Sequence, residues 1–71
     1  MRMKLNTKEK LLAETKRVQK EFIKQGSYWS LEDCLDMLVK NGNIVTNIES
    51  IYSTRLVVQT IDSKVNEIIN D

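Results

Sequence analysis

Few side chains of this 71-residue chain could carry enzymatic chemistry, because it has no histidine and a single cysteine. Histidine is the side chain that most readily exchanges a proton near neutral pH. Cys34 lies on the apolar side of a predicted helix, with no histidine or lysine placed to lower the pKa of its thiol. Such a cysteine is typical of a protein core. We therefore expect a non-enzymatic protein with no cofactor.

Acidic residues offer a second kind of chemistry, because Glu32, Asp33 and Asp36 could supply oxygen ligands to a divalent cation. Acids are also favoured in the first turns of a helix, where they interact with the helix dipole. The chain has neither a calcium-loop pattern nor a Gly-rich phosphate loop. We therefore predict no metal site and expect these three acids to be exposed at the start of a helix.

A basic ribbon on the first predicted helix is the candidate site for a polyanion, and its members are Lys16, Arg17, Lys20 and Lys24. Residues 1–27 carry eight Lys or Arg and three acids, whereas residues 28–71 carry three and seven. The ribbon could follow phosphates, attract an acidic surface, or simply be a solvated helix face. A net charge of +1 is low for a nucleic-acid-binding domain. A small DNA-binding regulator is therefore the alternative function.

Two adjacent aromatic residues, Tyr28 and Trp29, lie in a short polar connection between the first two predicted helices. Aromatic pairs are frequent anchors at protein interfaces, so they are the candidate partner-binding residues. The alternative is structural. Trp29 directly precedes a helix cap and can pack on Cys34 as a hydrophobic staple, while Tyr28 covers the helices.

Apolar residues at helical spacing predict an all-α fold with three helices, near 7–25, 31–40 and 47–70, in a single domain that covers residues 1–71. Capping residues are expected at three helix starts, and they are Asn6, Ser30 and Thr46. The two glycines, Gly26 and Gly42, are expected to end the first two helices. The weakest segment is 51–61, whose β-branched and aromatic residues would also suit a hairpin. It lacks the alternation and the turn residues that a hairpin needs.

The last predicted helix carries a heptad pattern, with apolar residues at Ile51, Val58, Ile61, Val65 and Ile68. A chain this short buries only about 60% of its unfolded surface, so association with a second copy would add stability. The second half of the pattern predicts a homodimer seam. Its candidate self-association residues are Val58, Ile61, Val65 and Ile68.

The composition favours a cytoplasmic protein, since a lone thiol suits a reducing compartment and no stretch resembles a signal peptide or a membrane span. The small size and the Asn-, Lys- and Ile-rich composition without Pro or His resemble small proteins of phages and mobile elements. Many of those block a host enzyme or a defence system. We therefore expect a homodimeric protein-binding module that inhibits or regulates a host or defence protein.

Overall fold

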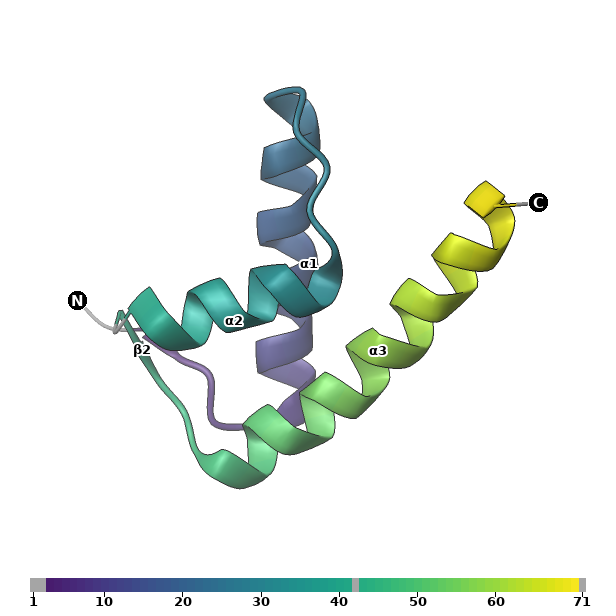
Figure 1. Cartoon of the computed structure of the whole chain (residues 1–71). Helices are drawn as coiled ribbons and strands as arrows, with labels where there is room; N and C mark the ends of the chain where they lie inside the picture. Colours follow the sequence, from purple (N-terminus) through teal and green to yellow (C-terminus); the bar gives the residue numbers. More distant parts are fainter. Residues whose placement is uncertain (1–2, 42, 71) are drawn as a thin grey trace.

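A computed structural model describes residues 3–41 and 43–70 of the chain (Figure 1). Three helices make up most of this part: α1 (Lys8–Lys24), α2 (Leu31–Asn41) and α3 (Ile48–Asn70). The three predicted helices are confirmed, each boundary falling within one residue of its expected place. Segment 51–61 is helical throughout, so the hairpin alternative is wrong. The predicted end of the second helix at Gly42 lies outside the described residues.

A pair of very short parallel strands was not expected in an all-α chain. Strand β1 (Met3–Lys4) pairs with β2 (Ile44–Val45), in the register Met3 to Ile44 and Lys4 to Val45. The backbone N–H of Leu5 extends the ladder by donating to the carbonyl of Val45 at 2.8 Å. Two residues per strand are too few to show an alternating pattern. The pair ties the start of the chain to the segment that leads into α3.

The helix caps correct two of the three predicted cap positions. Thr7 caps α1 by accepting from the N–H of Lys10 at 3.2 Å, and Asn47 caps α3 by accepting from Ser50 at 2.8 Å. Each cap is one residue later than predicted, and the carbonyl of Asn6 accepts instead from the Ser50 hydroxyl at 2.9 Å. Ser30 caps α2 as expected. The Asn6 carbonyl, which also accepts from the Asn47 side chain at 3.3 Å, therefore joins the N-terminal segment to the start of α3.

The core lies where the three helices cross. In Figure 1 α2 crosses α1, and α3 runs past both before its C-terminal half separates from them. The buried cluster draws on β1–α1, α2 and α3, and its members are Leu5, Leu11, Leu31, Leu35 and Val58. Cys34 and Leu38 of α2 are also buried, so the prediction that Cys34 lies on the apolar side of the second helix is confirmed.

Thr54 is a polar residue in this core that should be replaceable with a gain in stability. Its side chain is fully buried, and its hydroxyl has no hydrogen-bond partner among the described residues. Because a buried unsatisfied hydroxyl is costly, Thr54→Val should raise the free energy of unfolding by about 1 kcal/mol. The midpoint of a urea titration should rise with an unchanged slope.

Thr60→Val is the matched control on the same helix, because the Thr60 hydroxyl is exposed and donates to the carbonyl of Leu56 at 3.0 Å. That change should alter stability by no more than about 0.5 kcal/mol. Equal effects of the two substitutions would mean that the Thr54 hydroxyl is satisfied in the folded protein.

Candidate functional site

The predicted partner-binding residues lie on an exposed apolar surface, which we call the aromatic corner and define as Phe22, Ile23, Tyr28 and Trp29. Trp29 stacks on Phe22 of α1, with ring centroids 5.1 Å apart and planes inclined by 19°. Tyr28 is 58% exposed, Ile23 51% and Trp29 40%. Large apolar side chains are normally buried, and a group of them at the surface is typical of an interaction site.

Local backbone structure holds the aromatic corner in place. Gly26 has a φ of +87°, and the N–H groups of Gly26 and Ser27 donate to the carbonyls of Ile23 and Phe22 at 3.0 and 2.9 Å. These bonds form a Schellman motif that ends α1, and the left-handed position favours glycine. The Gln19 side chain donates to the Trp29 carbonyl at 2.8 Å. The connection is therefore anchored on both sides of Tyr28.

Two hollows flank the aromatic corner. The first, of about 310 Å³, is mainly apolar and is lined by Ile23, Gly26, Ser27 and Tyr28. Space is open above Gly26, since a Cβ added there would meet no atom within 4 Å. The second hollow, of about 300 Å³, lies between Trp29 and the exposed side of α2, and its lining includes Asp33, Asp36 and Lys40. The corner therefore offers an apolar and a charged recess next to each other.

The predicted self-association seam is divided between the core and the surface. Val58 is fully buried within the single chain, where it belongs to the core cluster, and Ile61 is partly buried against that cluster. Self-association through these residues stays a prediction, and in the single chain Val58 is already covered. Val65 is half-buried, and Ile68, near the end of α3, is 77% exposed. Only this last part of the predicted seam lies at the surface.

The basic ribbon is less uniform than its sequence suggests. The Arg17 guanidinium turns toward Glu14 and donates to both carboxylate oxygens, at 2.6 and 2.9 Å. Lys24 lies 3.7 Å from the carboxylate of Glu21. Lys16 and Lys20 are exposed and form no ion pair with the described residues. Two of the four predicted polyanion-binding residues therefore already have an acidic neighbour.

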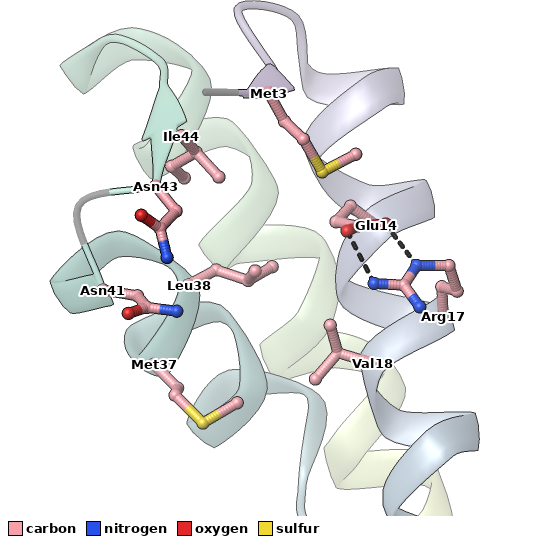
Figure 2. A pocket seen from close by; sticks show the side chains of 9 residues that line it. All are labelled: Met3, Glu14, Arg17, Val18, Met37, Leu38, Asn41, Asn43 and Ile44. Atoms are coloured by element: carbon pink, nitrogen blue, oxygen red, sulfur yellow. Dashed lines mark hydrogen bonds and ion pairs between the residues drawn. The ribbon is translucent and has the colours of Figure 1, made fainter. Parts of the chain in front are cut away.

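A groove of about 520 Å³ opens beside the Arg17–Glu14 pair, between α1, α2 and the strand pair (Figure 2). The carboxylate of Glu14 lines it, together with apolar side chains such as Leu38 and Ile44 and the amides of Asn41 and Asn43. Glu14 is only 7% exposed, and both of its carboxylate oxygens accept hydrogen bonds from Arg17. The groove therefore presents an acid that is already neutralised and is not available as a proton acceptor.

The ion pair predicts a pH dependence of stability. The hydrogen bonds from Arg17 lower the pKa of Glu14 below its ordinary value of 4.5, despite an opposing effect of burial. A lowered pKa stabilises the fold at pH values above the unfolded pKa, and this contribution is lost as the pH falls through the folded pKa. The unmodified protein should therefore be more stable than Glu14→Gln at neutral pH. The difference should shrink as the pH falls below the ordinary pKa of 4.5 and vanish once the pH is below the lowered pKa of Glu14 in the folded protein.

Urea titrations of the two proteins across this pH range test the prediction. Glu21→Gln is the control, because Glu21 is exposed and its contact with Lys24 is long. The prediction would be contradicted if the free energies of unfolding of the unmodified protein and of Glu14→Gln differed by the same amount at every pH.

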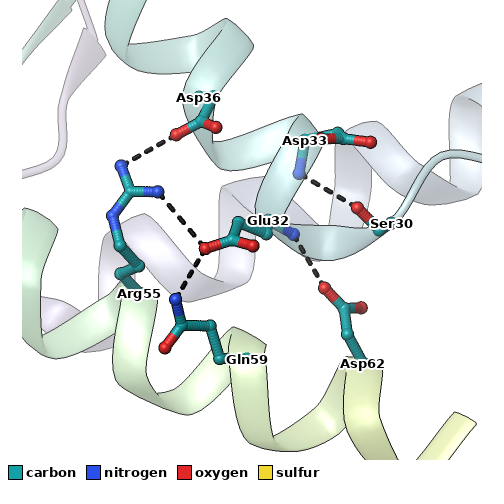
Figure 3. A network of polar contacts seen from close by, with 7 residues as sticks. All are labelled: Ser30, Glu32, Asp33, Asp36, Arg55, Gln59 and Asp62. Atoms are coloured by element: carbon teal, nitrogen blue, oxygen red, sulfur yellow. Dashed lines mark hydrogen bonds and ion pairs between the residues drawn. The ribbon is translucent and has the colours of Figure 1, made fainter. Parts of the chain in front are cut away.

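Two of the three acids of α2, Glu32 and Asp36, join a network with α3 (Figure 3). Arg55 donates to Asp36 at 2.8 Å and lies 3.5 Å from Glu32, which also accepts from Gln59 at 2.7 Å. Asp62 accepts from the N–H groups of Leu31 and Glu32, each at 3.0 Å. The Arg55 guanidinium thus lies beside two of the three acids considered as cation ligands, and no cluster of metal-ligating residues is found in the described ranges.

Cys34 has the environment of a structural residue. The side chain is fully buried in α2, and burial raises the pKa of its thiol, with a smaller effect from the charges of Asp33 and Asp62. A raised pKa keeps the thiol protonated at neutral pH, whereas a nucleophilic cysteine needs a lowered one. Cys34 is therefore suited to packing and not to catalysis.

One exposed feature was not recognised in the sequence. Ile48, Tyr52 and Leu56 form a ridge on the outer side of α3, with exposures of 85%, 63% and 51%. Their spacing of four residues is visible in the sequence. The sequence-based prediction included only the heptad residues, which lie on the opposite side of the helix. The acidic residues nearest to this ridge in the sequence are Glu49 and Asp62. Of these two, only Asp62 is hydrogen-bonded to α2 among the described residues.

Comparisons with known proteins assign no relative, because no protein-family model, curated protein or solved structure matches the chain. None of the described helices has the length and apolar character needed to cross a membrane. The candidate site therefore has to be interpreted from its own geometry.

Proposed function

We propose that the protein is a non-enzymatic protein-binding module that acts as an inhibitor, adaptor or antitoxin-like regulator through its aromatic corner. The observation that carries this proposal is Trp29, which is stacked on Phe22 yet remains 40% exposed. Interface energy is concentrated in a few aromatic anchors. A tryptophan that is already held in place loses little conformational freedom when a partner binds.

The surroundings of Trp29 favour a protein over a nucleic acid. Asp33 and Asp36 lie on the neighbouring turn of α2 and line the second hollow. The charge of Asp33, which has no ion pair among the described residues, would repel phosphates close to the aromatic rings, whereas Asp36 is paired with Arg55. On α1, Arg17 is paired with Glu14, and Lys24 lies near Glu21. Two of the four cations of the ribbon are therefore less available to neutralise phosphates. The DNA-binding alternative therefore has weaker support.

We also propose that the module is a homodimer joined at the end of α3. The C-terminal half of this helix separates from the other two helices (Figure 1), and Ile68 is 77% exposed there. An isolated apolar helix end is stabilised when it packs on a second copy. The aromatic corner lies at the C-terminal end of α1 and in the connection to α2, so no residue of α3 belongs to it.

A photo-crosslinking experiment tests the aromatic corner. A photoreactive phenylalanine analogue replaces Tyr28 in one protein and Tyr52 in the control, and both are expressed in cells that make the protein naturally. We expect a discrete heavier adduct from position 28, its loss when Trp29→Ala is added, and its absence from position 52. Equal adducts at both positions, or none at position 28, would contradict the proposal.

A further inference from the structure

The aromatic corner also indicates what kind of segment it binds. We infer that the partner presents an Arg or Lys side chain over Trp29 and an adjacent apolar side chain in the hollow at Gly26; this rests on the proposed function. Three observations carry the inference: the exposure of the stacked indole, the charges beside it, and the two hollows.

Trp29 stays partly exposed although it is stacked. Phe22 stacks on one side of the indole, with ring centroids 5.1 Å apart, and the residue is 40% exposed. Tryptophan is the aromatic side chain that binds a cation best, when the charge lies within about 6 Å of the ring. The stack on Phe22 and the Gln19 hydrogen bond to the Trp29 carbonyl hold the ring in its position before any partner arrives.

The charges around Trp29 favour a cation. Asp33 follows one helical turn later, is exposed, and has no ion pair among the residues that the structure describes. Asp36 lines the same hollow but is held by Arg55 at 2.8 Å, and Lys40 is the cation at its far side. Seven residues separate Lys40 from Asp33, which is about 10 Å along a helix. A positive group over Trp29 therefore meets Asp33 first.

The second part of the recognition is apolar. The hollow of about 310 Å³ beside Tyr28 is lined mainly by apolar surface, and the missing side chain of Gly26 leaves its floor open. One aliphatic or aromatic side chain fits such a volume. Tyr28 lines the first hollow and Trp29, the next residue, lines the second, so neighbouring residues of one extended segment can occupy both.

A random heptapeptide library displayed on phage, selected on the immobilised full chain, tests the inference. Peptides are kept if they bind the unmodified protein and the Tyr52→Ala control but not Trp29→Ala. We expect Arg or Lys next to a large apolar residue to be enriched at least about threefold over the unselected library. Since Trp29 is the only tryptophan, its fluorescence reports binding of a synthetic peptide directly.

Two changes then isolate the cation. Replacing the arginine of the selected peptide by the neutral isostere citrulline should weaken binding by about three- to tenfold, and so should Asp33→Asn in the protein. Glu49→Gln, an exposed acid on α3, is the control and should leave the affinity unchanged. The Asp33→Asn result decides the matter even if Trp29→Ala does not fold.

The outcomes separate this inference from the proposed function. If the peptides need Trp29 but are not basic, or if the arginine and citrulline peptides bind equally well, the inference of a cationic partner side chain is wrong. The proposal that the aromatic corner binds a protein would still stand. A selection that yields no Trp29-dependent peptide would overturn both.

Discussion

Leu35→Ala should lower the free energy of unfolding by about 2–5 kcal/mol, which is a large share of what a small domain has. Leu35 is fully buried in α2, inside the cluster that α1, α2 and α3 build together. Removal of its isobutyl group leaves a cavity that three crossing helices cannot fill by moving one of them. Thermal unfolding followed by circular dichroism should show the midpoint falling by at least about 10 °C.

Leu56→Ala is the matched control, because it removes the same atoms from a leucine that is 51% exposed on the outer ridge of α3. We expect it to change the free energy of unfolding by about 0.5 kcal/mol. Similar losses from both substitutions would mean that α3 presents a different face to the core from the one described.

The helices could be predicted from the sequence because their information is local. Periodic apolar residues and a glycine at 26 mark α1, and Ser30 marks the start of α2. Segment 51–61 was the hardest case, since its residues prefer strands. Thr54 and Val58 are nevertheless fully buried one turn apart on α3, which shows that burial of one helix face outweighs intrinsic preference here.

Interactions between distant residues could not be predicted. Asp62 caps α2 from 30 and 31 positions away, and β1 pairs with a strand that follows two helices. No local pattern encodes either contact, because each depends on how the helices cross. Cys34 could be predicted as a core residue because helical spacing is local, whereas the partners of Glu32 and Asp36 could not be predicted because they lie on α3.

The candidate site was predicted in part. Tyr28 and Trp29 were recognised as an exposed aromatic pair, but the stack on Phe22 and the two hollows depend on the way α1 ends and α2 begins. The ribbon was read from spacing alone. Spacing places Arg17 on the basic face, whereas the rotamer that turns it toward Glu14 is a property of the packed helix.

The heptad pattern of α3 should respond in opposite ways at its two ends. Val58→Asp should unfold the chain, because it buries an unpaired carboxylate at a fully buried position, at a cost of several kcal/mol. Ile68→Asp should leave the helical content unchanged, since Ile68 is 77% exposed in the single chain. If Ile68 joins two copies, the same replacement should also convert the homodimer into a folded monomer.

Light scattering and circular dichroism together separate these effects. The unmodified protein should have about twice the mass of one chain, Ile68→Asp the mass of one chain with an unchanged helical spectrum, and Val58→Asp a spectrum without helix. If the unmodified protein stays monomeric at high concentration, the homodimer proposal is wrong. The exposed Ile68 would then need another partner. A folded Val58→Asp variant would instead show that α1 and α2 do not enclose this residue, and the original seam would return as the dimer interface.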